Sequence, residues 1–225
     1  MLKSGIDQEA LVSMFASASA KQTDQIKSAV TRATLGALQG RELTLKNIRE
    51  VLKTVSQAVG AGAAKNPVAG IDVELLLNSA VAGMDQALMK AVEANQRALQ
   101  QFVDRGSDLK EKHLKKALGD LEKFEDMLFE AVRKAAGGAG AKLATPWDHV
   151  LERMQAGGTL SGAKASSTVE QMAAQLQSAM RDSRAAGLRA AQTLAESYTA
   201  LVSGVLIGMS DALRQGTGVR QDRKK

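Results

Sequence analysis

Helix breakers are scarce along this chain, and this restricts its fold more than any other feature. Only two prolines, Pro67 and Pro146, occur in 225 residues. Apolar residues make up 44 % of the chain but aromatic residues only 3 %, so Ala, Leu, Val and Met must supply most of the core. This composition, with so few breakers, predicts an all-α fold.

Glycine-rich stretches mark the breaks between the predicted helices. The stretches "AAGGAGAK" (135–142) and "AGGTLSGAKAS" (156–166) are typical of flexible linkers. Between them we expect one short helix that begins with Thr145 as N-cap and Pro146 in the first turn. The predicted parts are N-terminal helices (1–66), a helical hairpin (67–136), a flexible linker with one short helix (137–165), a long C-terminal helix (166–216) and a basic tail (217–225).

Two successive stretches, about 72–105 and 108–135, carry apolar residues at alternating steps of four and three. Such heptad seams predict a hairpin whose two arms pack in the manner of a coiled coil. Asn95 is the polar member of the first seam, and we expect it to fix helix association. The seams are Leu77, Val81, Met84, Leu88, Ala91, Asn95, Ala98 and Phe102, followed by Leu114, Ala117, Leu121, Phe124, Leu128, Ala131 and Ala135.

The last stretch runs from about residue 166 to Leu213 without a proline. An unbroken helix of this length would reach about 70 Å. The sequence therefore predicts an elongated bundle with a very long C-terminal helix, which either bends at Gly187 or Gly204 or reaches another chain or a surface.

An uncharged run, Ser197 to Ser210, lies in this last helix. It is too short to cross a bilayer, which takes about twenty apolar residues, so we expect no transmembrane segment. Small residues recur every four positions and predict a face for helix association: Ala200, Gly204, Gly208 and Ala212. Large apolar residues cover the other faces and are candidates for adsorption to a hydrophobic surface: Leu201, Val205, Leu206, Ile207 and Met209.

The sequence offers no convergent set of catalytic groups. Cysteine is absent, and neither His113 nor His149 follows a Glu by three positions, as a di-iron bundle would require. We interpret His149 as a solvent-exposed residue of the short helix, which Trp147 packs onto the bundle. We therefore expect a non-catalytic protein without cofactor or metal site.

The net charge of +6 is concentrated in part at the C-terminus, where "VRQDRKK" carries +3. A basic tail favours anionic partners, so a nucleoid-associated protein is one alternative. That alternative predicts DNA binding that depends steeply on salt and is mostly lost without residues 219–225. Acidic residues Asp7 and Glu9 stand where a secretory signal has positive charge, and we expect a cytoplasmic protein.

The Ala/Gln/Leu-rich amphipathic helices, the missing cysteine and the scarce aromatics resemble phasins, the helical proteins that coat bacterial polyhydroxyalkanoate granules, or a related bacterial helical family. The likeness is general and lies in stretches such as "KAVEANQRALQQFVD" (90–104) and "RAAGLRAAQTLAESYTALVSGV" (184–205). It covers about the last two-thirds of the chain. The resemblance implies a non-catalytic protein that oligomerises and adsorbs to a hydrophobic polymer granule or lipid surface. A homo-oligomeric scaffold or adaptor, held by the hairpin and by the Gly204/Gly208 face, is the other main alternative.

Overall fold

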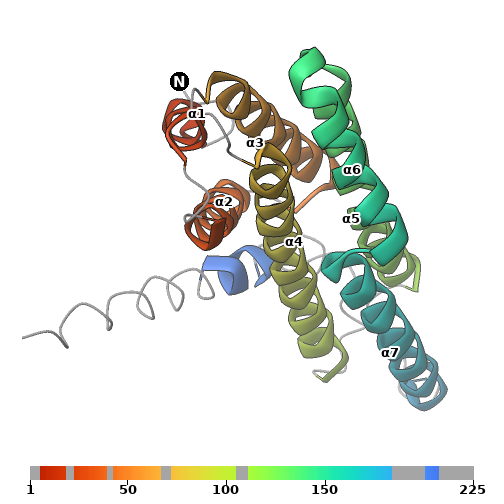
Figure 1. Ribbon diagram of the computed structural model, residues 1–225. Helices are drawn as coiled ribbons and strands as arrows, with labels where there is room; N and C mark the ends of the chain where they lie inside the picture. The colour runs from red at the N-terminus through yellow and green to blue at the C-terminus, as the bar shows by residue number, and fades with distance from the viewer. Residues whose placement is uncertain are drawn as a thin grey trace, which may run out of the picture.

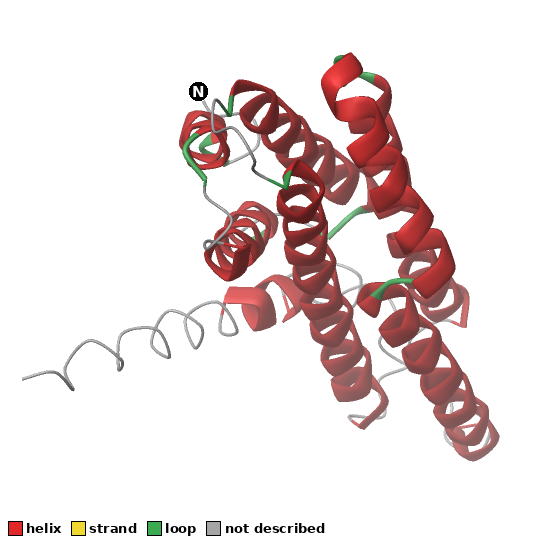
Figure 2. Cartoon of the chain, viewed as in Figure 1, coloured by secondary structure: helices red, strands yellow, loops and turns green. Residues whose placement is uncertain are grey.

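The computed structural model describes residues 6–18, 23–39, 43–66, 72–104, 111–183 and 201–207. All regular secondary structure within these ranges is helical (Figures 1 and 2), which confirms the predicted all-α class. The helices are α1 (Gln8–Ala16), α2 (Thr23–Leu38), α3 (Leu45–Lys65), α4 (Val73–Asp104), α5 (Glu111–Gly137), α6 (Ala141–Gly157) and α7 (Leu160–Ser183). Residues 201–207 form a further helical segment.

Acidic side chains set the start of two of these helices. Asp7 accepts a hydrogen bond from the Ala10 N–H at 2.9 Å and caps α1. Asp72 accepts one from the Leu75 N–H at 3.0 Å at the start of α4. Each carboxylate satisfies an amide that has no partner within the first turn of its helix.

Helix α4 lies at the centre of the bundle, with α2 on one side and α7 on the other (Figure 1). Helix α3 packs against α1 and α5, and α5 also contacts α7. Helix α6 rests on α4 and α5. The buried side chains of all seven helices and of residues 201–207 form one continuous core.

The heptad seams are buried, but they do not pair with each other as predicted. The seam residues of α4 from Leu77 to Ala98 are all buried, and so are those of α5 from Leu121 to Ala135. Helix α4 nevertheless packs chiefly against α2 and α7, and α5 chiefly against α3 and α7. The predicted coiled-coil hairpin is therefore not observed, because helices from elsewhere in the chain cover most of each seam.

Two glycines allow neighbouring helices to approach closely. A Cβ on Gly62 of α3 would lie 2.7 Å from the backbone oxygen of Val12 in α1, and one on Gly83 of α4 would lie 2.7 Å from that of Lys27 in α2. Thr31 also donates a hydrogen bond to the Gly83 carbonyl at 3.1 Å. The backbones of α1 and α3, and those of α2 and α4, are thus in close contact. This contact depends on glycine, which has no side chain, at positions 62 and 83.

The predicted flexible linker is largely helical. Helix α6 begins at Ala141 instead of Thr145 and has 17 residues, and α7 begins at Leu160 inside the second glycine-rich stretch. The reason is an apolar stripe that extends upstream of the proline and is buried in the bundle: Leu143, Trp147, Val150 and Met154. The breaks that remain are short, and Gly158 turns the chain with a φ of 67°. The division into domains stays a prediction.

The sequence predicts a very long C-terminal helix that either bends at Gly187 or Gly204 or reaches another chain or a surface. Helix α7 is described as far as Ser183, and residues 201–207 lie beside α2 and α4 instead of along the line of α7 (Figure 1). The Gln39 side chain, just after α2, donates a hydrogen bond to the Leu206 carbonyl at 3.2 Å. The two described parts are therefore not collinear.

Candidate functional site

The helical segment 201–207 carries most of the predicted adsorption residues. Val202 and Leu206 are 1 % and 0 % exposed and belong to the core. Leu201 and Val205 are half-buried and pack against it. The apolar face of this segment is thus held against the protein's own bundle.

Outside this buried face, the segment is open to solvent. Ile207 is 44 % exposed, and Gly204 is exposed as well. A Cβ built on Gly204 would meet no other atom within 4 Å. Within the described chain, the small-residue face at Gly204 is therefore not used for packing.

The structure reaches only part of the two predicted residue sets. Met209, Ala200, Gly208 and Ala212 lie outside the described residues, as does the basic tail. Asn95 is buried in α4 and donates a hydrogen bond to the Ala91 carbonyl of its own helix at 2.9 Å. Its role in helix association stays a prediction.

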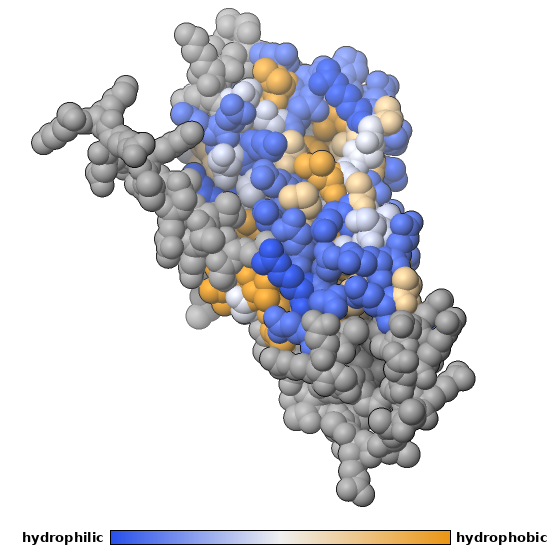
Figure 3. Space-filling model, turned by 90° about the horizontal axis from the view of Figure 1, so that it is seen from below, coloured by the Kyte–Doolittle hydropathy of each residue, from blue (hydrophilic) through white to orange (hydrophobic). Residues whose placement is uncertain are grey.

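The closed bundle exposes little apolar surface in the part that the structure describes. Its large exposed apolar residues are Leu75, Leu160 and Ile207, from three different segments. Seen from below, the described surface is mostly hydrophilic, with apolar residues in small separate groups (Figure 3). Within the described residues, an extended apolar binding surface would therefore form only if a segment left the bundle.

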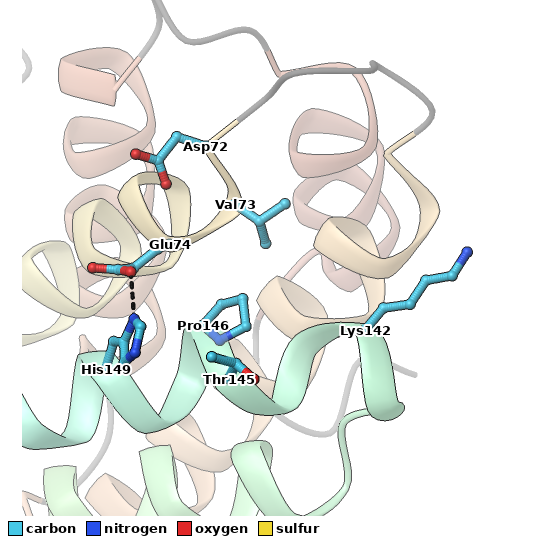
Figure 4. Close-up of a pocket in the computed structure, with 7 residues that line it drawn as sticks. All are labelled: Asp72, Val73, Glu74, Lys142, Thr145, Pro146 and His149. Carbon is cyan, nitrogen blue, oxygen red and sulfur yellow. Dashed lines mark hydrogen bonds and ion pairs between the residues drawn. The ribbon is translucent and has the colours of Figure 1, made fainter.

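A second candidate site lies between the start of α4 and α6, where an open hollow of about 350 Å³ is found (Figure 4). On its floor, His149 Nδ1 and Glu74 Oε2 are 2.8 Å apart, and the Arg153 guanidinium contacts the other oxygen of the same carboxylate. The hollow is lined by Asp72, Val73, Glu74, Lys142, Thr145, Pro146 and His149. Because Glu74 is engaged by two groups of α6, the cluster joins two helices and does not present a free carboxylate to a ligand.

The hydrogen bond to Glu74 raises the pKa of His149 above its ordinary value of 6.5, and partial desolvation opposes this. The charge of Glu74 also favours the imidazolium. The sequence predicts Trp147 in the core and His149 in solvent, and both predictions are confirmed: Trp147 is 0 % exposed and the His149 side chain 49 %. The partner Glu74 is not predictable from local sequence, because 75 residues separate it from His149.

Two further carboxylates converge on the first turn of α7, and the sequence analysis missed both. Asp85 of α4 is buried and accepts hydrogen bonds from the Leu160 and Ser161 N–H groups at 2.7 and 2.9 Å. Glu125 of α5 accepts two more, from the N–H of Thr159 at 3.1 Å and from its hydroxyl at 2.7 Å. In the sequence, Asp85 directly follows Met84 of the first seam, but nothing local connects either carboxylate to residues 159–161, which are 75 and 34 residues away.

The histidines and carboxylates of the described residues form no group of three that could hold a metal ion. None of the described helices combines the length and apolar character that crossing a membrane requires. A model for a family of unknown function, DUF6781, matches residues 1–215. No curated protein and no solved structure matches the chain.

Proposed function

The chain belongs to the DUF6781 family, whose function is unknown, and on this premise we propose that it is a non-catalytic, phasin-like protein of the bacterial cytoplasm. In this proposal it self-associates and coats a hydrophobic granule or surface through amphipathic helices. The surface-binding element is the segment 201–207. It leaves the bundle and turns its apolar face to the particle.

The docking of this segment is the observation that carries the proposal. Val202 and Leu206 are fully buried, and the Gln39 side chain donates a hydrogen bond to the Leu206 carbonyl. A fully buried Val or Leu side chain contributes about 1.5–3 kcal/mol relative to exposure. This gain is largely kept when the side chain moves from one apolar environment to another, so a particle can compete with the bundle.

The exposed Ile207 favours the adsorbed state further. Its side chain is 44 % exposed in the closed bundle and would be removed from water at an apolar surface. The same segment therefore has a face that the bundle already covers and an apolar residue that only a partner would cover.

The test combines particle binding with two matched variants. We expect the purified chain to sediment with polyhydroxyalkanoate particles and a fluorescently tagged chain to ring the granules of a polymer-accumulating bacterium. The double change Val205→Asp and Ile207→Asp should abolish both. Leu75→Asp is the matched control, because Leu75 is 41 % exposed but lies on α4, and it should leave binding unchanged.

Two outcomes would count against this proposal. A wild-type chain that stays in the supernatant and diffuse in the cell would overturn the coating function. Undiminished binding of the double variant, with its helical circular dichroism intact, would show that another surface binds the particle.

The second candidate is a homo-oligomeric scaffold or adaptor, and the open surface at Gly204 favours it. Because a Cβ there meets nothing within 4 Å in the part of the chain that the structure describes, a helix of a second copy has room to approach this face. Light scattering should then give one discrete oligomer mass, which Gly204→Leu should lower. A monomer at all concentrations would exclude this candidate.

A further inference from the structure

The start of α7 is held by carboxylates from two other helices. Asp85 of α4 and Glu125 of α5 together accept four hydrogen bonds from Thr159, Leu160 and Ser161. Three of the donors are backbone N–H groups, those of Leu160 and Ser161 in the first turn of α7 and that of Thr159 directly before it, where the helix dipole also favours negative charge. We call these two carboxylates and their partners the latch.

The chain directly before the latch has the features of a hinge. Gly157 ends α6, and Gly158 follows with a φ of 67°, a conformation that glycine adopts without strain. Side chains added at either glycine would meet nothing within 4 Å. The two glycines themselves therefore make no side-chain contact that a rotation at this connection would have to break.

The face that α7 turns to the bundle is poor in large apolar residues. Its buried described members are Ser161, Gly162, Ala165, Thr168 and Met172. Helix α3, by contrast, buries Ile48, Val51, Leu52, Val55 and Val59. In residues 160–175, the part of α7 whose side chains the structure describes, fewer large apolar side chains are fully buried than in α3, and apolar burial is the main stabilising term.

Further along α7, the described contacts to α4 include polar ones. Gln96 donates a hydrogen bond to the Gln171 side chain at 3.0 Å, and Thr168 contacts the Gln96 oxygen at 3.5 Å. Between Asp85 and Gln96, helical spacing places Met89 and Val92 on the same stripe of α4. Opening of α7 would expose this stripe to solvent, including Val92, which is fully buried in the closed form.

We propose that α7 is a hinged arm, which swings away from α4 and α5 about Gly158 while α1–α6 stay folded, and that Asp85 and Glu125 form the latch that keeps it closed. The arm is a conformational device of the chain itself and does not require the surface-coating function. The opening is a sub-global event, with a free energy below that of global unfolding.

The experiment follows amide hydrogen exchange of the full-length chain without particles. In the wild type, the amides of α7 should exchange through an opening that depends less on denaturant than the exchange of α3 and α4 amides. Asp85→Asn and Glu125→Gln should each accelerate α7 exchange at least about tenfold, because each leaves a helix-start donor without its charged acceptor. The exchange of α3 amides should stay unchanged.

Matched controls separate the latch from general charge effects. Glu122→Gln removes the same charge from an exposed position three residues before Glu125, and Asp126→Asn does so from the next residue; neither should change α7 exchange. Gly162→Ala is the sharpest variant. Alanine raises helix propensity, but its Cβ would overlap the Glu125 carboxylate, so opening should become faster despite the better helix former.

The absence of cysteine allows a direct distance measurement as well. Spin labels at the exposed positions Ser166 of α7 and Glu122 of α5 should show a second, longer distance that grows in Asp85→Asn. Labels at Lys53 of α3 and Glu122 should keep a single distance. If α7 amides exchange only with global unfolding in the wild type, or if the latch variants leave both readouts unchanged, the hinged arm is excluded, and neither result bears on particle binding.

Discussion

His149 and Arg153 both contact the carboxylate of Glu74, and this small group of charges joins α6 to the start of α4. At the scale of single residues, carboxylates in this protein repeatedly connect helices that are distant in sequence. Asp85 and Glu125 do the same at the start of α7. Each of these contacts satisfies polar groups at a helix interface, where an unpaired group would be destabilising.

The Glu74–His149 pair predicts a pH dependence of stability. The pKa of His149 is raised in the folded chain. The stabilisation of the folded state by the charged imidazole is therefore fully present below the unfolded pKa near 6.5, and it is lost as the pH rises through the folded pKa. The difference in urea midpoint between the wild type and His149→Gln should therefore be larger at about pH 6 than at about pH 9. A difference that does not change with pH would mean that the imidazolium is not involved.

At the scale of the elements, close helix packing should give two glycine-to-alanine changes in α3 opposite effects on stability. Gly62→Ala forces a Cβ against the α1 backbone at Val12, and we expect a loss of about 1–3 kcal/mol in the free energy of unfolding. Gly60→Ala, two residues earlier, meets no atom within 4 Å and should gain about 0.5–1 kcal/mol from helix propensity. Urea unfolding of both variants, followed by circular dichroism, measures the contrast, and equal effects would contradict the close approach of α1.

The helix boundaries show what element-level patterns can and cannot predict. The breaks predicted at Gly138 and Gly140 and at Gly157 and Gly158 are confirmed. The composition around them, rich in glycine and small residues, predicts longer linkers than the structure has. Tertiary burial of Leu143 and Ala165 instead continues α6 and α7 almost to the glycines, since packing outweighs weak local propensity.

At the scale of the whole molecule, α4 is the shared centre, with α2 and α7 on its two sides (Figure 1). Residues 201–207 lie far in sequence from α2 yet contact Gln39 at its end. The C-terminal region thus has two separate attachments to the bundle, one through α7 and one through this segment.

Removing residues 184–225 should test the second attachment. The shortened chain keeps α1–α7 but loses Val202 and Leu206 from the core, and we expect it to stay helical with a stability lower by about 2–5 kcal/mol. Particle sedimentation should be lost at the same time. The control is the full-length double variant Val202→Ala and Leu206→Ala. It keeps every residue of the chain, and its stability should still fall, because the same two side chains leave the core. An unchanged urea midpoint after the truncation would contradict the docking of 201–207.

The composition of the sequence, with only two prolines, determined the all-α class. Local spacing determined the buried positions of most helices, because a helical period places residues such as Leu77, Val81 and Met84 on one face regardless of what covers it. It also indicated Trp147 as a core residue. Only the tertiary structure decided which helix covers each face: α2 and α7 on α4, and α3 on α5. The latch at Asp85 and Glu125, the Glu74–His149 pair and the docking of Leu206 were likewise not predictable, since each joins residues from distant parts of the chain. Such contacts depend on how helices distant in sequence pack together, and the spacing of residues within one helix carries no information on that packing.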